Sequence, residues 1–445
     1  MKKLSLSLIV LFVTITLFAY DVQIDGIYYN LNHKTNTAEV THDGSLLDYN
    51  GAGYNESKII IPQSIIYPKK QYNVTSIRLL AFLECKSIKS ISIPSSITEI
   101  GEAAFLECLS LNSIIVNNNN KKYASIDGVL YNKDFTKLIC CPSGTNLTSI
   151  QIPNSVTSIE SRAFANCVSL TSVTIPNGVT KIDFVTFAGC TQLHDITISP
   201  SVKEIAERAF DGCTSLTSIT LPNSITQIGE QVFKNCSSLK YITCLATEPP
   251  CISYIPDYKN CTLYIPNGTL KKYQNHKTWS KFHKIRELIY KIDSIYYNLD
   301  HENKIAKITY PYEWESNNYS NFTSITIPTI VTYNGTEYNV TSIDEYAFST
   351  CTKLRFVKIN ASITEIAKNA FNGCENILSI TIENKLPPMI YKDTFNGVAN
   401  TIQIIVPHKT SKLYKSANHW NRFTNYEEVS YIKTLWNKIK SFFFE

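Results

Sequence analysis

The sequence lacks the short motifs by which many enzymes are recognised. It contains no G-x-S-x-G nucleophile elbow, no H-E-x-x-H metal helix, no glycine-rich phosphate loop and no dinucleotide-binding fingerprint. Acidic residues are scattered along the chain, and no pair can be argued to face each other as a glycosidase requires. These absences predict a protein that performs no catalysis and holds no cofactor.

The composition also gives little support to metal or nucleic-acid sites. No two of the 13 cysteines are spaced as C-x-x-C, so a zinc knuckle is unsupported. The formal charge of the chain is +5, a small surplus that disfavours a nucleic-acid binder. His276 with His283, and His408 with His419, share two short segments, but this spacing does not force metal ligands to converge.

Long apolar stretches are confined to the first residues of the chain. Two lysines precede an apolar run from Leu8 to Phe18, and Ala19 offers a small residue for cleavage. This order is typical of a secretory signal peptide at residues 1–19, and the alternative is an uncleaved membrane anchor. No later stretch is long and apolar enough to cross a bilayer, so we expect an exported protein, secreted or at the cell surface.

What the chain does contain is a phenylalanine followed three residues later by a cysteine, repeated at a step of 23 residues. Between the copies runs a second pattern, L-x-x-I-x-L-P, which includes Leu216, Ile219 and Leu221. A constant period of this length predicts a solenoid, in which short strands point apolar side chains inward and stacked coils cover one another. The predicted repeat core consists of Phe82, Cys85, Phe105, Cys108, Phe164, Cys167, Phe187, Cys190, Phe210, Cys213, Phe233, Cys236, Phe348, Cys351, Phe371 and Cys374.

This repeat resembles the BspA-type leucine-rich repeats of bacterial surface proteins. The likeness is carried by the run ITLPNSITQIG from Ile219 to Gly229, followed by Phe233 and Cys236. The resemblance implies a mostly β leucine-rich-repeat solenoid with 23-residue repeats. It also implies a bacterial cell-surface or extracellular role such as adhesion, although a fold says little about chemistry.

Two units of one design follow each other along the chain. The segment from Asp25 to Leu31 recurs from Asp293 to Leu299, and each copy precedes a set of repeats and then an aromatic segment. We expect the hairpins and the aromatic segments to cover the open ends of the solenoid. The predicted organisation is a signal peptide at 1–19, a β-hairpin cap at 20–57, leucine-rich repeats at 58–244 with a hairpin insertion at 117–146, a cap module at 245–290, a second hairpin cap at 291–317, a second repeat set at 318–382, a second cap module at 383–429 and an amphipathic tail at 430–445.

Eight of the 13 cysteines hold one place in the repeat. A residue that always follows a core phenylalanine is most simply a small buried filler with a free thiol. Stacked coils would also bring neighbouring Cα atoms to about 5 Å, inside the disulfide range, so bridges between coils remain an alternative. Cys244, Cys251 and Cys261 lie close enough in sequence for one bridge. Because the total is odd, at least one thiol lacks an internal partner.

One outward position lies between the inward residues of each strand, and stacking turns these positions into a ladder along one face. Most are Ser or Thr, which suit a soluble β face, so a binding site needs a break in this uniformity. The candidate binding residues at such breaks are, in the two units, His194, Asp195, Lys240, Tyr241, Arg355, Phe356 and Lys358. An exposed phenylalanine beside two cations, as in the second unit, suits an interface.

The tail at 430–445 has the period of an amphipathic helix with lysines beside its apolar stripe. The stripe consists of Ile432, Leu435, Trp436, Ile439, Phe442 and Phe443. The pattern predicts either a helix that makes peripheral contact with the envelope or a partner, or a helix packed against the preceding cap module.

The sequence therefore predicts a secreted or cell-surface binding protein that recognises a protein or glycan on a host or neighbouring cell. It predicts no catalysis and no nucleic-acid partner. The alternative is a structural or assembly component of the envelope that docks other surface proteins through its cap modules and tail. The identity of the ligand does not follow from the repeat pattern.

Overall fold

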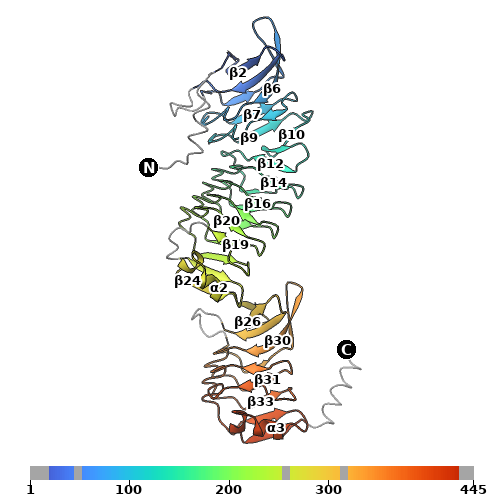
Figure 1. The fold of residues 1–445 in the computed structure, drawn as a ribbon, viewed down its shortest axis with the longest axis vertical. Helices are drawn as coiled ribbons and strands as arrows, with labels where there is room; N and C mark the ends of the chain where they lie inside the picture. Colours follow the sequence, from blue (N-terminus) through green and yellow to red (C-terminus); the bar gives the residue numbers. More distant parts are fainter. Residues whose placement is uncertain (1–19, 45–52, 253–260, 311–318, 430–445) are drawn as a thin grey trace, which may run out of the picture. The chain divides into compact units, whose positions relative to one another are not determined.

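The computed structural model describes residues 20–44, 53–252, 261–310 and 319–429. In these ranges the chain is mostly β and its coils stack as a solenoid (Figure 1), which confirms the predicted fold class. The chain divides into two compact units, Met1–Ile265 with Lys271–Arg286, and Pro266–Leu270 with Glu287–Glu445. The signal peptide and the amphipathic tail lie outside the described residues, and the predicted cap boundaries stay predictions.

In the first unit, each coil gives one strand to a row of sheets whose outer side we call the ladder face. Ser172 lies opposite Asp195 on the neighbouring strand, and Ser218 lies opposite Tyr241. Ile219 is buried and Thr220 is exposed, as the alternation of a strand with one buried side requires. These strands are β4 (Lys58–Ile60), β7 (Ser90–Ile93), β9 (Ser113–Val116), β13 (Ser149–Ile150), β15 (Ser172–Thr174), β17 (Asp195–Thr197), β19 (Ser218–Leu221), β21 (Tyr241–Cys244), β23 (Thr262–Ile265) and β24 (Lys284–Glu287).

A second strand in each coil, usually of two residues, forms another row in which neighbours are parallel. Ile205 lies opposite Ile182 and Ile228, and all three side chains are buried. These strands are β6 (Gln71–Ile77), β8 (Glu99–Ile100), β12 (Lys137–Cys140), β14 (Ser158–Ile159), β16 (Lys181–Ile182), β18 (Glu204–Ile205), β20 (Gln227–Ile228) and β22 (Cys251–Ile252).

Antiparallel strands precede and interrupt the coils of the first unit. Tyr29 and Val40 of the first hairpin are buried in the same core cluster as Phe82 and Phe105. The insertion between the coils of Phe105 and Phe164 also contains a hairpin. These strands are β1 (Val22–Ile24), β2 (Ile27–Asn32), β3 (Thr37–Thr41), β5 (Ser64–Ile66), β10 (Tyr123–Ile126) and β11 (Val129–Asn132).

The second unit repeats this plan around its own core cluster. Its ladder face is formed by β28 (Ser324–Thr326), β31 (Phe356–Ile359), β33 (Ser379–Ile382), β35 (Gln403–Val406) and β36 (Asn425–Glu428). The other strands are β25 (Tyr290–Ile292), β26 (Ile295–Asp300), β27 (Ile305–Thr309), β29 (Ile330–Tyr333), β30 (Thr336–Ile343), β32 (Glu365–Ile366) and β34 (Met389–Ile390).

The repeated phenylalanines form a column of stacked rings in the interior. Ring centroids of Phe164, Phe187, Phe210 and Phe233 follow one another at 4.9, 5.5 and 5.8 Å, with planes within 16° of parallel. In the second unit Phe371 stacks on Phe348 at 5.2 Å and on Phe395 at 5.3 Å. Each ring therefore covers the apolar face of the coil beside it.

The repeated cysteines have a second role beyond filling space. The Sγ of Cys213 donates a hydrogen bond to the Phe187 carbonyl of the preceding coil at 3.2 Å, and Cys190 reaches the Phe164 carbonyl at 3.1 Å. Cys108, Cys236 and Cys374 make the same contact. All 13 cysteines are free thiols, including the three for which the sequence leaves a bridge open.

Buried thiols of this kind should resist alkylation until the chain unfolds. Burial raises the pKa of Cys236 from 9.0 to about 12, and that of Cys261 to about 11. At pH 8 iodoacetamide should modify the exposed Cys251 first and the repeat cysteines only in denaturant, as peptide mass spectrometry can measure. Labelling of Cys213 as fast as Cys251 in the native protein would show that the column is open.

The same pKa shifts predict a loss of stability in alkali. A thiol whose pKa is higher in the folded than in the unfolded state contributes its full stabilisation below about pH 9 and loses it as the pH rises towards 11–12. We therefore expect the unfolding temperature to fall between pH 9 and 11, and to fall less in a Cys236→Ala variant measured beside the wild type.

The second row of strands ends, in each unit, at a tryptophan whose indole supplies the hydrogen bond that a further strand would have made. Within the stack, the Thr226 carbonyl accepts from Cys251 N, and the Thr364 carbonyl accepts from Met389 N, both at 2.9 Å. In the last coil of each set, the residues that correspond to Thr226 and Thr364 are Pro250 and Pro388. Their carbonyls accept instead from the indole Nε1 of Trp279 and Trp420, both at 2.8 Å. Trp279 begins η2 (Trp279–Lys281), after α2 (Leu270–Asn275), and Trp420 begins η3 (Trp420–Arg422), after α3 (Ser411–Ser416).

Removing the indole donor should destabilise the end of a stack. Trp420→Phe keeps an aromatic ring but leaves the buried Pro388 carbonyl without its donor, at a cost of about 1–3 kcal/mol. We expect a lower unfolding temperature in a thermal melt of the full chain, and a similar loss for Trp279→Phe. Unchanged melting in both variants would mean that the indole bond does not stabilise the ends.

Candidate functional site

The ladder face of the second unit contains the sharpest break in the row of hydroxyl side chains. Phe356 is 50% exposed on β31, whereas Val357 and Ile359 on the same strand are buried. It lies between two small residues, Ser324 on β28 and Ser379 on β33. The ring therefore projects from a paired strand whose other side is anchored in the core.

Leu378, which the sequence did not predict, is a second exposed apolar residue and immediately precedes Ser379, the strand partner of Phe356. It is 54% exposed, and its backbone N–H donates to the carbonyl of Arg355 at 2.8 Å. Its position immediately precedes the strand, where the outward alternation does not yet apply. The sequence nevertheless marks Leu378 as unusual, because the corresponding residues of other repeats, such as Thr171, Lys240 and Arg355, are polar.

Cations surround these two apolar side chains. Lys358 lies two residues after Phe356 on the same face and pairs with Glu383 at 2.8 Å. Lys353 donates to the amide oxygen of Asn321 at 2.9 Å. Arg355 is exposed and makes no ion pair with any residue that the structure describes. The three predicted residues Arg355, Phe356 and Lys358 are thus brought together, with Leu378 beside them.

The four candidates of the first unit are all exposed but do not form one cluster. His194 and Asp195 lie at β17, Lys240 and Tyr241 at β21, and β19 runs between these strands. With strands about 4.8 Å apart, the two pairs are about 10 Å from each other. Tyr241 instead meets Tyr264 on β23, with ring centroids 6.1 Å apart.

The described residues contain no group of side chains arranged to hold a metal ion. Within residues 20–44, 53–252, 261–310 and 319–429, no three His, Cys, Asp or Glu side chains converge as metal ligands would. In the same ranges no helix has the length and apolar content needed to span a bilayer.

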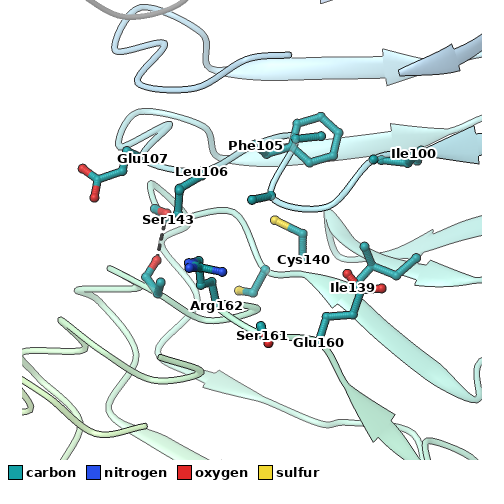
Figure 2. Close-up of a pocket in the computed structure, with 15 residues that line it drawn as sticks. Ile100, Phe105, Leu106, Glu107, Ile139, Cys140, Ser143, Glu160, Ser161 and Arg162 are labelled. Carbon is teal, nitrogen blue, oxygen red and sulfur yellow. Dashed lines mark hydrogen bonds between the residues drawn. The ribbon is translucent and has the colours of Figure 1, made fainter. Parts of the chain in front are cut away.

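The hairpin insertion leaves a small hollow in the first unit, which Figure 2 shows in close-up. Cys141 there takes the place of a column phenylalanine, because its N–H donates to the Ala163 carbonyl as Phe164 N–H donates to that of Thr186. The smaller side chain leaves about 40 Å³ between Phe105 and Arg162. A space of this size holds about one water molecule and no larger ligand.

A wider, open hollow of about 310 Å³ lies in the second unit along β34. Its lining includes Pro387, Pro388 and Met389 from one segment and His419 and Trp420 from another. Met389 is 53% exposed, so this hollow is an apolar surface at the end of the second row of strands.

Stacked parallel strands with inward Leu and Ile and outward Ser and Thr define a leucine-rich-repeat solenoid with a broad display face. The family model described as a BspA type leucine rich repeat region matches six copies, over residues 58–134, 140–258 and 316–445. The chain therefore belongs to the BspA-type leucine-rich-repeat family, as the resemblance implied.

Several solved structures are similar to this chain. A leucine rich cell surface protein from Faecalibacterium prausnitzii A2-165 is 24% identical over 94% of this chain and 96% of its own, with a TM-score of 0.35. A leucine-rich repeat protein from Bacteroides ovatus is 21% identical over 92% and 100%, with a TM-score of 0.37. The pneumococcal vaccine antigen PcpA is 17% identical over 61% and 99%, with a TM-score of 0.39. A search of curated proteins finds no match.

Proposed function

We propose that this protein is a non-enzymatic binding protein of the cell surface, whose ladder face recognises another protein. The observation that carries the proposal is the exposed Phe356, which lies between Ser324 and Ser379 on the neighbouring strands, together with the exposed Leu378 of the next coil. Large apolar side chains held on a rigid surface are typical anchors of protein interfaces, where a few residues supply most of the binding free energy.

The scaffold favours binding because its display face is preorganised. The main-chain hydrogen bonds between β28, β31, β33 and β35 are formed before any ligand arrives. A partner therefore orders few groups on this protein when it binds, which keeps the entropic cost low. The second ligand class that we propose is a glycan, which would bind the first unit, where Tyr241 and Tyr264 form an aromatic pair on the ladder face.

Surface location is supported by two findings of different kinds. The first is that the chain belongs to the BspA-type family. The apolar run from Leu8 to Phe18 has the order of an export signal. We propose that the protein is exported and acts in adhesion to host or neighbouring cells.

The second candidate function is assembly within the envelope through the cap modules and tail. It is favoured by the open apolar hollow beside Met389 in the second cap module. On this account the protein would dock other surface proteins, and the ladder face would have no ligand of its own.

Capture of extracellular proteins by single variants tests the first proposal. Phe356→Thr replaces the ring by a hydroxyl side chain, as in its neighbours Ser324 and Ser379. It should weaken capture of immobilised matrix proteins and mucins by about tenfold or more, the loss expected of an interface anchor. The unfolding temperature should stay unchanged, because the ring is half exposed. The matched control is Leu413→Thr, which alters a 47% exposed side chain on α3, a helix that contacts β36, three strands away from β31.

The outcomes separate the two candidate functions. Equal loss of capture in both variants, or no loss in Phe356→Thr, contradicts a binding site on the ladder face. Removal of residues 430–445 that releases the protein from the envelope but leaves capture intact supports peripheral anchoring by the tail. Removal of the same residues that abolishes both retention in the envelope and capture favours the assembly role.

A further inference from the structure

The apolar pair on the ladder face of the second unit lies within a local excess of positive charge. We define the Phe356 patch as Arg355, Phe356, Lys358 and Leu378. Arg355 and Lys358 flank the ring along the strand, and Lys353 lies two residues before Arg355. The neighbouring carboxylates are Glu375, three residues before Leu378, and Glu383, which pairs with Lys358.

The pairing leaves the charge of Arg355 uncompensated within the patch. Glu383 neutralises much of the field of Lys358, whose ammonium it meets at 2.8 Å. Arg355 has no such carboxylate among the described residues, and its exposed guanidinium has five N–H donors in a planar fork. A carboxylate is the group that this fork binds with two parallel hydrogen bonds.

The patch therefore combines a carboxylate receptor with an apolar platform at its centre. Nucleic acid does not fit this combination, because a phosphate backbone needs many cations and gains nothing from Leu378 and Phe356. A sulfated glycan meets the same objection at Leu378, which offers no hydrogen bond to a sugar hydroxyl. A polypeptide supplies both features within a few residues.

We infer that the Phe356 patch binds an acidic polypeptide segment in which an apolar side chain is flanked by carboxylates. The apolar side chain packs against Phe356 and Leu378, and one flanking carboxylate accepts from the Arg355 guanidinium. This inference rests on the proposed protein-binding function and adds the chemical class of the partner. Charge complementarity of this kind sets partner choice and association rate as well as affinity.

A library of displayed random peptides, selected on the full chain, reads out the preferred partner chemistry directly. The expected result is enrichment of peptides with Asp or Glu on both sides of an aliphatic or aromatic residue. Binding of the most enriched synthetic peptide, followed by fluorescence polarisation, should weaken as the salt concentration rises, because exposed charges are screened.

Four variants then assign the binding to the patch. Phe356→Thr and Arg355→Gln should each weaken the peptide by about tenfold, and Leu413→Thr should leave it unchanged. Glu383→Gln releases Lys358 from its ion pair and should strengthen binding by about two- to threefold, which is a few tenths of a kcal/mol by the usual conversion of affinity to free energy. A gain on removing a surface carboxylate is not expected from mere damage to the fold.

Each alternative outcome overturns the inference. Enriched peptides that are neutral or basic, yet lose binding in Phe356→Thr, refute the acidic partner while leaving the proposed function intact. Acidic peptides that bind Phe356→Thr as well as the wild type place the site elsewhere. Binding of heparin at the patch, with no peptide enriched, identifies a polyanionic glycan instead. Failure of peptides and also of intact matrix proteins and mucins in the capture assay counts against the proposed function itself.

Discussion

The contact on which the rest of the structure depends is the stacking of one phenylalanine ring on the ring of the next coil. A single coil has too little interior to bury its own apolar face, so it is stable only with a neighbour on each side. Burying one phenylalanine gains about 1.5–3 kcal/mol, and an aromatic pair adds about 0.5–1.5 kcal/mol. The thiol of Cys213 ties the same two coils together through the Phe187 carbonyl.

This constraint explains where the sequence is uniform and where it varies. The column keeps its spacing only if successive coils have equal length, so the inward positions repeat closely. Outward positions such as Thr220 and Phe356 contribute little to the column and can change without disturbing it. Function in such a scaffold therefore resides in the departures from the outward pattern, and the fold gives no information about the ligand.

Much of the fold could be predicted from the sequence, because period and alternation are themselves the physical cause of the coils. The inward and outward assignment of Ile219 and Thr220 is confirmed, as are the family and the solenoid. The thiol hydrogen bonds could not be predicted, since they depend on where a carbonyl in another coil points. The role of Cys141 was hidden because the insertion lengthens one coil and a cysteine then occupies a phenylalanine position.

The candidate site was predicted in part, for reasons that differ between the units. Arg355, Phe356 and Lys358 are neighbours in sequence, so their clustering required only a strand. Leu378 joins them through the pairing of two coils, which sequence distance conceals. His194 and Tyr241 are two coils apart, and the repeat length alone could have shown that they do not touch.

Native-state hydrogen exchange on a Phe210→Ala variant tests the column most directly. Loss of a buried phenylalanine costs about 3–5 kcal/mol, and that cost should fall on the coils in contact with it. The account predicts reduced amide protection in the coils of Phe187, Phe210 and Phe233, with protection kept around Phe82 at the other end of the unit. Unchanged protection near Phe210, or an even loss along the whole unit, would contradict it.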